Sequence, residues 1–173
     1  PYLVGGAGQD GYSDVISPPS NQPLKNGDIL MLDTGSSLKG YFCDFDRNWA
    51  IGKASNLAKT AYSKLYNATE VALKKIRPGI TCEQVFSLIN NSLGVGGSDI
   101  GRMGHGLGLQ LTEPPSIMNS AKTILKENMI ITIEPCYEYL PGKMIVIEEN
   151  ILITKDGYEL LTSRTPKLLP IIN

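Results

Sequence analysis

The sequence has no long apolar run, no marked excess of either charge and few cysteines, and each shortage excludes a class of protein. No apolar run approaches the roughly 18 residues that span a bilayer, so we expect no membrane partner. The 16 basic and 17 acidic residues give a net charge of −1 at pH 7. Because no basic stripe is present either, we expect no nucleic acid partner.

Cysteine usage indicates the compartment. The three cysteines, Cys43, Cys82 and Cys136, are odd in number and widely spaced, which does not predict a disulfide framework. A reducing compartment fits this pattern, and we expect the protein in the cytoplasm. The 173 residues, 42% hydrophobic and 19% charged, have the composition of one globular domain with its own core. Because the chain starts at Pro1 and passes directly into a glycine-rich stretch, we expect a piece of a longer protein.

The first half of the chain changes from loop to strand to helix. Residues 1–27 are rich in Gly, Pro, Ser and Asn and predict loops around short strands. Apolar, aromatic and β-branched residues predict strands over 28–37 and 40–52. Apolar residues then recur every three or four positions and predict a helix over 56–76.

The second half returns to strands. A second helix is expected from Thr81, with Gln84 completing a capping box, to about Leu93, where the glycine-rich stretch 94–99 breaks it. Two strands follow, MIITIEPCYEY and MIVIEENILIT, and then a turn in KDGYEL. Strands, two helices and strands again predict an α+β fold with a sheet whose two halves resemble each other.

The only histidine, His105, lies in the stretch GHGLGLQLTEPP. A lone histidine is more often a structural residue than a ligand. The glycines on both sides of His105 lack a Cβ atom, however, and allow the backbone to approach something closely. This environment favours a functional site.

Four acidic residues are predicted to meet in pairs. If Leu38 and Lys39 form a two-residue hairpin loop, Asp33 and Asp44 lie directly opposite each other, with Cβ atoms about 5 Å apart. A turn at Pro141–Gly142 places Glu134 opposite Glu148 in the same way. Acidic residues on strands often simply face water. Here, however, the two carboxylates of each opposed pair repel each other, and a bound cation would relieve this repulsion. Divalent manganese, iron, cobalt or zinc suits such oxygen-rich ligands with one imidazole.

The sequence resembles the pita-bread metallopeptidases, the family of methionine aminopeptidase, Xaa-Pro aminopeptidase, prolidase and creatinase. The resemblance covers about residues 24–165 and rests on LDTGSSLKGYFCDFDRNWAIG, GHGLGLQLTEPP, ITIEPCYEY and IVIEENILITKDGYELLT. It implies an α+β pita-bread fold, with a pseudo-twofold sheet and flanking helices. Residues 1–173 would then be a catalytic domain that lacks its first helices and the amino-terminal domain of prolidase-like members. A homodimer is expected by resemblance alone.

The family holds two metal ions with five side chains. Matched residue by residue, these ligands are Asp33, Asp44, His105, Glu134 and Glu148. The resemblance implies a water or hydroxide that bridges the two ions and attacks an amide carbonyl. It also implies that Glu134 is both a ligand and the general base.

The residues expected around the substrate depart from the family pattern. Thr112 occupies the position of a second histidine, and Val146 stands where the family has an arginine. A further family histidine would fall within DVISPP, where the sequence has none. Arg47 matches the family arginine after the second Asp, although DFDRN is not the usual sequence. The substrate-binding residues therefore stay unknown.

Three functions follow from the resemblance. The first is a metal-dependent hydrolase of peptide or amide bonds, of the Xaa-Pro aminopeptidase or prolidase type, acting on a small peptide or amide. The missing histidines keep open a creatinase-like hydrolase of a small non-peptide C–N bond. The third is a catalytically inactive binding module of the same fold, against which the five matched ligands argue.

Overall fold

One antiparallel sheet is built around a long hairpin near the N-terminus. The computed structural model describes residues 1–94 and 101–173. Four strands form this sheet in the order β1-β2-β3-β11: β1 (Tyr2–Gln9), β2 (Asp28–Leu38), β3 (Tyr41–Ile51) and β11 (Ile171–Ile172). The short β11 pairs with β3 in parallel, and the other pairs are antiparallel.

A second sheet contains five strands in the order β10-β9-β6-β4-β5. Its strands are β4 (Gly104–Gly106), β5 (Glu113–Ser116), β6 (Ile130–Ile133), β9 (Glu149–Ile153) and β10 (Tyr158–Leu160). A separate hairpin is formed by β7 (Cys136–Leu140) and β8 (Lys143–Val146). Because β3 contacts β9 of the second sheet and β8 of the separate hairpin, β3 joins the first sheet to both.

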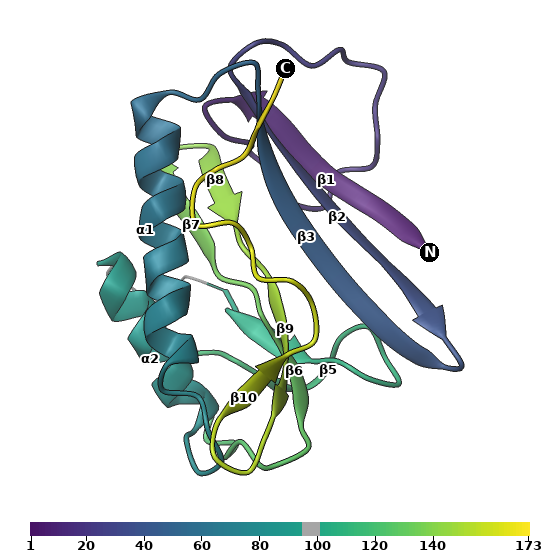
Figure 1. The fold of residues 1–173 in the computed structure, drawn as a ribbon, viewed down its shortest axis with the longest axis vertical. Helices are drawn as coiled ribbons and strands as arrows, with labels where there is room; N and C mark the ends of the chain where they lie inside the picture. The colour runs from purple at the N-terminus through teal and green to yellow at the C-terminus, as the bar shows by residue number, and fades with distance from the viewer. Residues whose placement is uncertain (95–100) are drawn as a thin grey trace.

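Two helices cover the second half of the molecule. The helix α1 (Asn56–Leu73) is capped by the side chain of Ser55, and α2 (Cys82–Leu93) by Thr81. Figure 1 shows α1 and α2 on one side of the molecule and the β2–β3 hairpin on the other, with β8 and β9 between them and β1 alongside the hairpin. Among the described residues, no helix is both long and apolar enough to cross a membrane.

The apolar core lies between these helices and the strands. The helices contribute fully buried side chains such as Leu65 and Ile89, and the five-stranded sheet contributes Ile131 and Ile151. Removing such side chains from water is the main favourable term in folding. The helix-covered half therefore forms the stable base on which the hairpin is held.

The expected helices are confirmed. α1 ends three residues earlier than the expected 56–76, and α2 agrees with the expected end at Leu93. Both hydrogen bonds of the capping box between Thr81 and Gln84 are present. Gly94 ends α2 with φ of +61°, a conformation that favours glycine. The rest of the expected glycine-rich break, residues 95–99, lies outside the described residues.

The strands differ from expectation in two places. Residues 1–27 include one long, regular strand, β1, because its glycines let it lie close to β2. A Cβ atom at Gly5 would be 2.3 Å from the carbonyl oxygen of Met31. The two strands expected over 129–139 and 144–154 are each broken, at residues 134–135 and at residues 147–148. Both breaks fall at an expected metal ligand, Glu134 or Glu148.

Candidate metal centre

Asp33 and Asp44 lie on one face of the β2–β3 hairpin, but they are not directly opposite each other. Asp33 pairs with Asp46, and Asp44 pairs with Gly35. The register expected from the sequence was therefore wrong by two residues. A shift of two keeps the alternation of side chains, so the carboxylates remain on one face as diagonal neighbours.

The position of the turn explains this shift. The two-residue loop consists of Lys39 and Gly40, one position later than expected, and Leu38 pairs with Tyr41. Lys39 has φ of +53° and Gly40 has φ of +87°. Two central residues with positive φ are typical of a type I′ hairpin turn, in which glycine is favoured. The expected loop would have placed Leu38 at positive φ, which is unfavourable for a bulky side chain.

The register expected for the second acidic pair is confirmed in its hairpin. Cys136 pairs with Val146 across the turn at residues 141–142. Glu134 and Glu148 lie two residues beyond this pair, at the breaks that separate β6 from β7 and β8 from β9.

His105 lies in β4, where the glycines on both sides allow close backbone contacts. A Cβ atom at Gly104 would be 2.2 Å from the carbonyl oxygen of Thr132. At Gly106 it would be 2.3 Å from the carbonyl oxygen of Pro114. The neighbouring strands therefore enclose His105, which is fully buried.

The five expected ligands converge from the hairpin, β4 and the two strand breaks. The His105 Nε2 atom is 3.5 Å from Asp44 Oδ2 and 3.4 Å from Glu134 Oε1. Ligand oxygens of Asp33, Asp44 and Glu148 all lie within 4.8 Å of one another. The structure thus brings all five side chains into one cluster, with Asp44 shared by both groups.

The geometry of this cluster fits a bound cation. Two ligand atoms that are each about 2.1 Å from one ion in tetrahedral geometry lie about 3.4 Å apart, close to the His105 distances. The His105 Nδ1 atom is 2.8 Å from the carbonyl oxygen of Gly106, which can only accept. The proton therefore lies on Nδ1, and a neutral ring presents a lone pair at Nε2. Nε2 and Glu148 Oε1 are buried without a hydrogen-bond partner.

The carboxylates have strongly shifted pKa values. Burial and the negative charge of Asp44 raise the pKa of Asp33 to about 6. Burial and the charges of Asp46 and Asp44 raise the pKa of Glu148 well above its ordinary value. Burial also opposes ionisation of Asp44, but the neighbouring His105 ring and the hydrogen bond from Tyr2 outweigh it and lower its pKa. The protein alone thus compensates the negative charge of the cluster poorly.

His105 and Glu134 influence each other. Burial lowers the pKa of His105, but Asp44 and Glu134 beside the ring outweigh burial and raise it. Burial raises the pKa of Glu134, against the positive charges of His105 and Arg102. Arg102 donates from Nε to Glu134 Oε1 at 3.2 Å and is half exposed. Glu134 therefore lies at the side of the cluster that solvent reaches.

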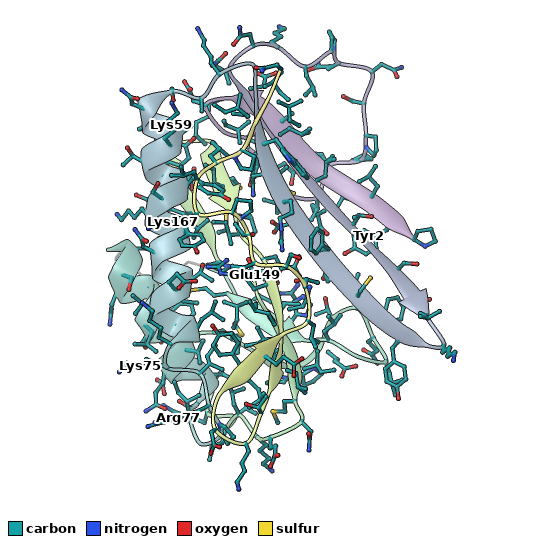
Figure 2. The ribbon with its side chains drawn as sticks, viewed as in Figure 1. Tyr2, Lys59, Lys75, Arg77, Glu149 and Lys167 are labelled. Atoms are coloured by element: carbon teal, nitrogen blue, oxygen red, sulfur yellow. The ribbon has the colours of Figure 1, made fainter. Side chains whose placement is uncertain are left out.

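Tyr2 was not expected in the site. Its hydroxyl donates to Asp33 Oδ1 at 3.0 Å and also makes a hydrogen bond with Asp44. Figure 2 shows Tyr2 at the start of β1, beside the hairpin, and Glu149 near the middle of the molecule. Tyr2 was not foreseen from the sequence, because the composition of residues 1–27 predicted loop. A strand assignment to β1 would have placed this side chain beside Asp33.

Asp46 and Arg47 lie beside the cluster and contact Glu148. Asp46 is 3% exposed, and its backbone N–H donates to Glu148 Oε2 at 2.7 Å. Arg47 donates to the carbonyl oxygen of Glu148 at 2.8 Å and lies 3.8 Å from the carboxylate of Glu149. The spacing of two between Asp44 and Asp46 was the signal that could have identified Asp46.

The residues that depart from the family pattern lie in different environments. Thr112 is exposed, in the segment between β4 and β5. Val146 is buried at the end of β8, and its carbonyl oxygen accepts from Asn48 Nδ2 at 2.6 Å. Thr112 can therefore meet solvent or a ligand, whereas Val146 is part of the packed interior.

Comparison with known proteins identifies the fold. The model of metallopeptidase family M24 matches residues 7–155. An Xaa-Pro dipeptidase of Pyrococcus horikoshii is 33% identical over 154 residues, 87% of this chain and 44% of the relative. The structure of dipeptidase PepE from Mycobacterium ulcerans matches with a TM-score of 0.90 and 30% identity, over 99% of this chain and 47% of that one.

A third relative, the X-Pro aminopeptidase of Thermotoga maritima, matches with a TM-score of 0.87 and 29% identity. That match covers 98% of this chain and 49% of the aminopeptidase chain. The expected α+β pita-bread fold is therefore confirmed. The chain spans about half the length of the relatives it matches.

Proposed function

Because the chain belongs to metallopeptidase family M24, we propose that it carries the metal centre of a peptide- or amide-bond hydrolase of the Xaa-Pro aminopeptidase or prolidase type. Relatives named as Xaa-Pro dipeptidase and X-Pro aminopeptidase support this class of substrate. The buried His105 Nε2 atom carries the proposal. It faces Asp44 and Glu134 at 3.5 and 3.4 Å and has no hydrogen-bond partner.

The proposed metal ligands are the five side chains of the cluster: Asp33, Asp44, His105, Glu134 and Glu148. They would hold two divalent cations, and manganese, cobalt, zinc and iron all suit this donor set. When bound, such a pair lowers the pKa of water toward neutrality and polarises the carbonyl group of the scissile bond.

Glu134 is the proposed general base. Its carboxylate lies at the solvent-facing side of the cluster, where it can accept a proton from water. An ionised carboxylate at this position is a suitable general base. Arg102 and His105 approach the same oxygen, Oε1, at 3.2 and 3.4 Å, and so orient the carboxylate.

A creatinase-like hydrolase of a small non-peptide C–N bond is the second candidate. It is favoured by Thr112, which is exposed where most family peptidases have a histidine. A threonine hydroxyl can donate or accept a hydrogen bond, but it cannot carry the charge of an imidazolium. An inactive binding module remains the third candidate and requires that no substrate of either class is hydrolysed.

The cellular setting is also proposed. The three cysteines are all unpaired, which supports a reducing compartment such as the cytoplasm. We also propose that residues 1–173 are part of one catalytic domain and that this domain assembles as a homodimer.

The test is a substrate panel assayed with the Mn²⁺-loaded protein. The first candidate predicts turnover of Xaa-Pro dipeptides, and the second predicts turnover of small guanidino or cyclic amides instead. Metal content measured on the same sample separates two failures. A metal-loaded protein that hydrolyses neither class supports the inactive module, whereas a protein without metal contradicts the metal centre itself.

A further inference from the structure

Asp46 is a fifth acidic residue at the metal centre and has no part in the proposed ligand set. It pairs directly with Asp33 across the hairpin, and it lies two residues from Asp44 on β3. Side chains alternate along a strand, so the carboxylates of Asp46, Asp44 and Asp33 share one face. Asp46 is therefore directed toward the cluster.

The carboxylate of Asp46 is buried without compensation. The residue is 3% exposed, and its Oδ1 atom has no hydrogen-bond partner. Within residues 1–94 and 101–173, no basic side chain forms an ion pair with it. A buried, unpaired carboxylate is costly, and proteins keep one mainly where a cation or a partner relieves it.

The neighbouring Arg47 offsets this buried charge only in part. As the next residue on β3, it points to the opposite face of the strand. Its Nη1 atom donates to the carbonyl oxygens of Asp46 and Glu148, and its Nη2 atom donates to that of Ser163. The carboxylate nearest to its guanidinium belongs to Glu149, at 3.8 Å.

Asp46 is also connected to a proposed ligand through its backbone. Its N–H donates to Glu148 Oε2 at 2.7 Å and so leaves Oε1 of Glu148 without a partner. The four acidic ligands together match the charge of two divalent cations, and Asp46 adds a further negative charge beside them. Its oxygens lie outside the group of Asp33, Asp44 and Glu148 oxygens, which makes it a neighbour of the ligands.

We propose that Asp46 is a positioning residue of the metal centre, whose carboxylate increases the affinity of the site for divalent cations. This inference rests on the proposed function, because it requires that the five-residue cluster binds metal. Partners just outside a metal's ligands typically change its affinity by about 10- to 100-fold. Their effect is exerted without a change in the number of bound ions.

The substitution Asp46→Asn tests the carboxylate alone. It keeps the size of the side chain and the backbone N–H that holds Glu148, and removes only the charge. Asp28→Asn is the matched control, because Asp28 is a buried aspartate of the same hairpin that accepts from the Lys25 N–H at 2.8 Å, at the far end of β2. Asp46→Glu restores a carboxylate at the same position.

Titration of the metal-free proteins with Mn²⁺ in a calorimeter gives the affinities. We expect Asp46→Asn to bind Mn²⁺ about 10- to 100-fold more weakly than the parent, and Asp46→Glu to recover part of the loss. Asp28→Asn should bind like the parent. The metal-free Asp46→Asn protein should melt at the same or a higher temperature, whereas a purely structural role predicts a lower one.

The outcomes separate this inference from the proposed function. If the parent binds Mn²⁺, Asp44→Asn loses an ion and Asp46→Asn binds with unchanged affinity, the metal centre stands and the role of Asp46 is wrong. If the parent binds no Mn²⁺, both are wrong. Should Asp46→Asn fail to fold, Asp46→Ser, which has a smaller side chain, decides by the same affinities.

Discussion

Leu65 and Asp46 are buried almost equally, at 0% and 3% exposed, yet burial acts on them in opposite directions. Leu65 lies on the buried face of α1, in the apolar core, where removal from water stabilises the fold. Asp46 lies at the acidic face of the β2–β3 hairpin, where burial raises the pKa of its carboxyl group well above the ordinary value.

The same contrast holds for the two regions as a whole. The core needs nothing beyond its own packing, whereas the acidic face leaves His105 Nε2, Asp46 Oδ1 and Glu148 Oε1 buried without partners. Unsatisfied buried polar groups are costly, so they point to a role beyond stability. The helix-covered half therefore supplies the stability that the hairpin face gives up for binding.

Glu134→Gln should break the function of the acidic face and leave the core intact. The amide keeps a metal-binding oxygen but cannot accept a proton, so hydrolysis should fall by about 100- to 10,000-fold. Initial rates of dipeptide hydrolysis measure the effect, and Glu127→Gln, at an exposed position, is the control. A rate within twofold of the parent would remove Glu134 from its role as base.

Leu65→Ala should break the core and leave the acidic face intact. Truncation of a fully buried leucine creates a cavity and should cost about 2–5 kcal/mol of unfolding free energy. Urea denaturation measures this, with Val71→Ala on the exposed side of α1 as the control. The number of Mn²⁺ ions per folded chain should not change, and a loss of metal would show that the two regions are not separable.

The stability of the metal-free protein should depend on pH through Asp33 on the acidic face. The pKa of Asp33 is raised to about 6 in the fold, above its ordinary value of about 3.9. Its contribution to stability is therefore fully present below about pH 4 and is lost as pH rises through about 6. Without metal, the parent should lose stability relative to Asp33→Asn across this window.

Melting temperatures of both proteins from pH 4 to 7 measure this difference. With excess Mn²⁺ the sign should reverse at neutral pH, because a bound cation favours the ionised carboxylate. Parallel curves for the two metal-free proteins would contradict the raised pKa of Asp33.

Thr81→Ala should have the smallest effect and should again be confined to the helix-covered half. The hydroxyl of Thr81 accepts from the N–H of Gln84 at 3.2 Å and caps α2. Its loss should cost about 1 kcal/mol of unfolding free energy, and Thr81→Ser should restore most of it. Unequal Mn²⁺ affinities of the two variants would mean that the helix end and the metal centre are coupled.

The helices were the most predictable part of the fold. Their apolar repeat, the capping box at Thr81 and the glycine at the end of α2 are all local signals. The strand β1 was less predictable, because its glycines are explained only by the close approach of β2. The position of the hairpin turn was also less predictable, because it depends on backbone angles. The two loop residues need positive φ, which Gly40 adopts more easily than Leu38, so the turn forms at Lys39–Gly40 and not at Leu38–Lys39.

The candidate site was predictable as a set of residues but not as a geometry. Resemblance identified Asp33, Asp44, His105, Glu134 and Glu148, and the fold brings them together. Tyr2 was missed because it joins the cluster through pairing of β1 with a strand far along the chain, and Asp46 because its spacing of two from Asp44 was not used. Asp46 shares the face of Asp44 by its spacing of two, and the hairpin register places it opposite Asp33.

The central claim is that the five converging side chains bind two metal ions. The most direct measurement is the metal content of the parent and of Asp44→Ala, by elemental analysis after equilibration with Mn²⁺ and removal of the excess. We expect two ions per chain for the parent and the loss of at least one in the variant. A parent without bound metal, or a variant that keeps two ions, would contradict it.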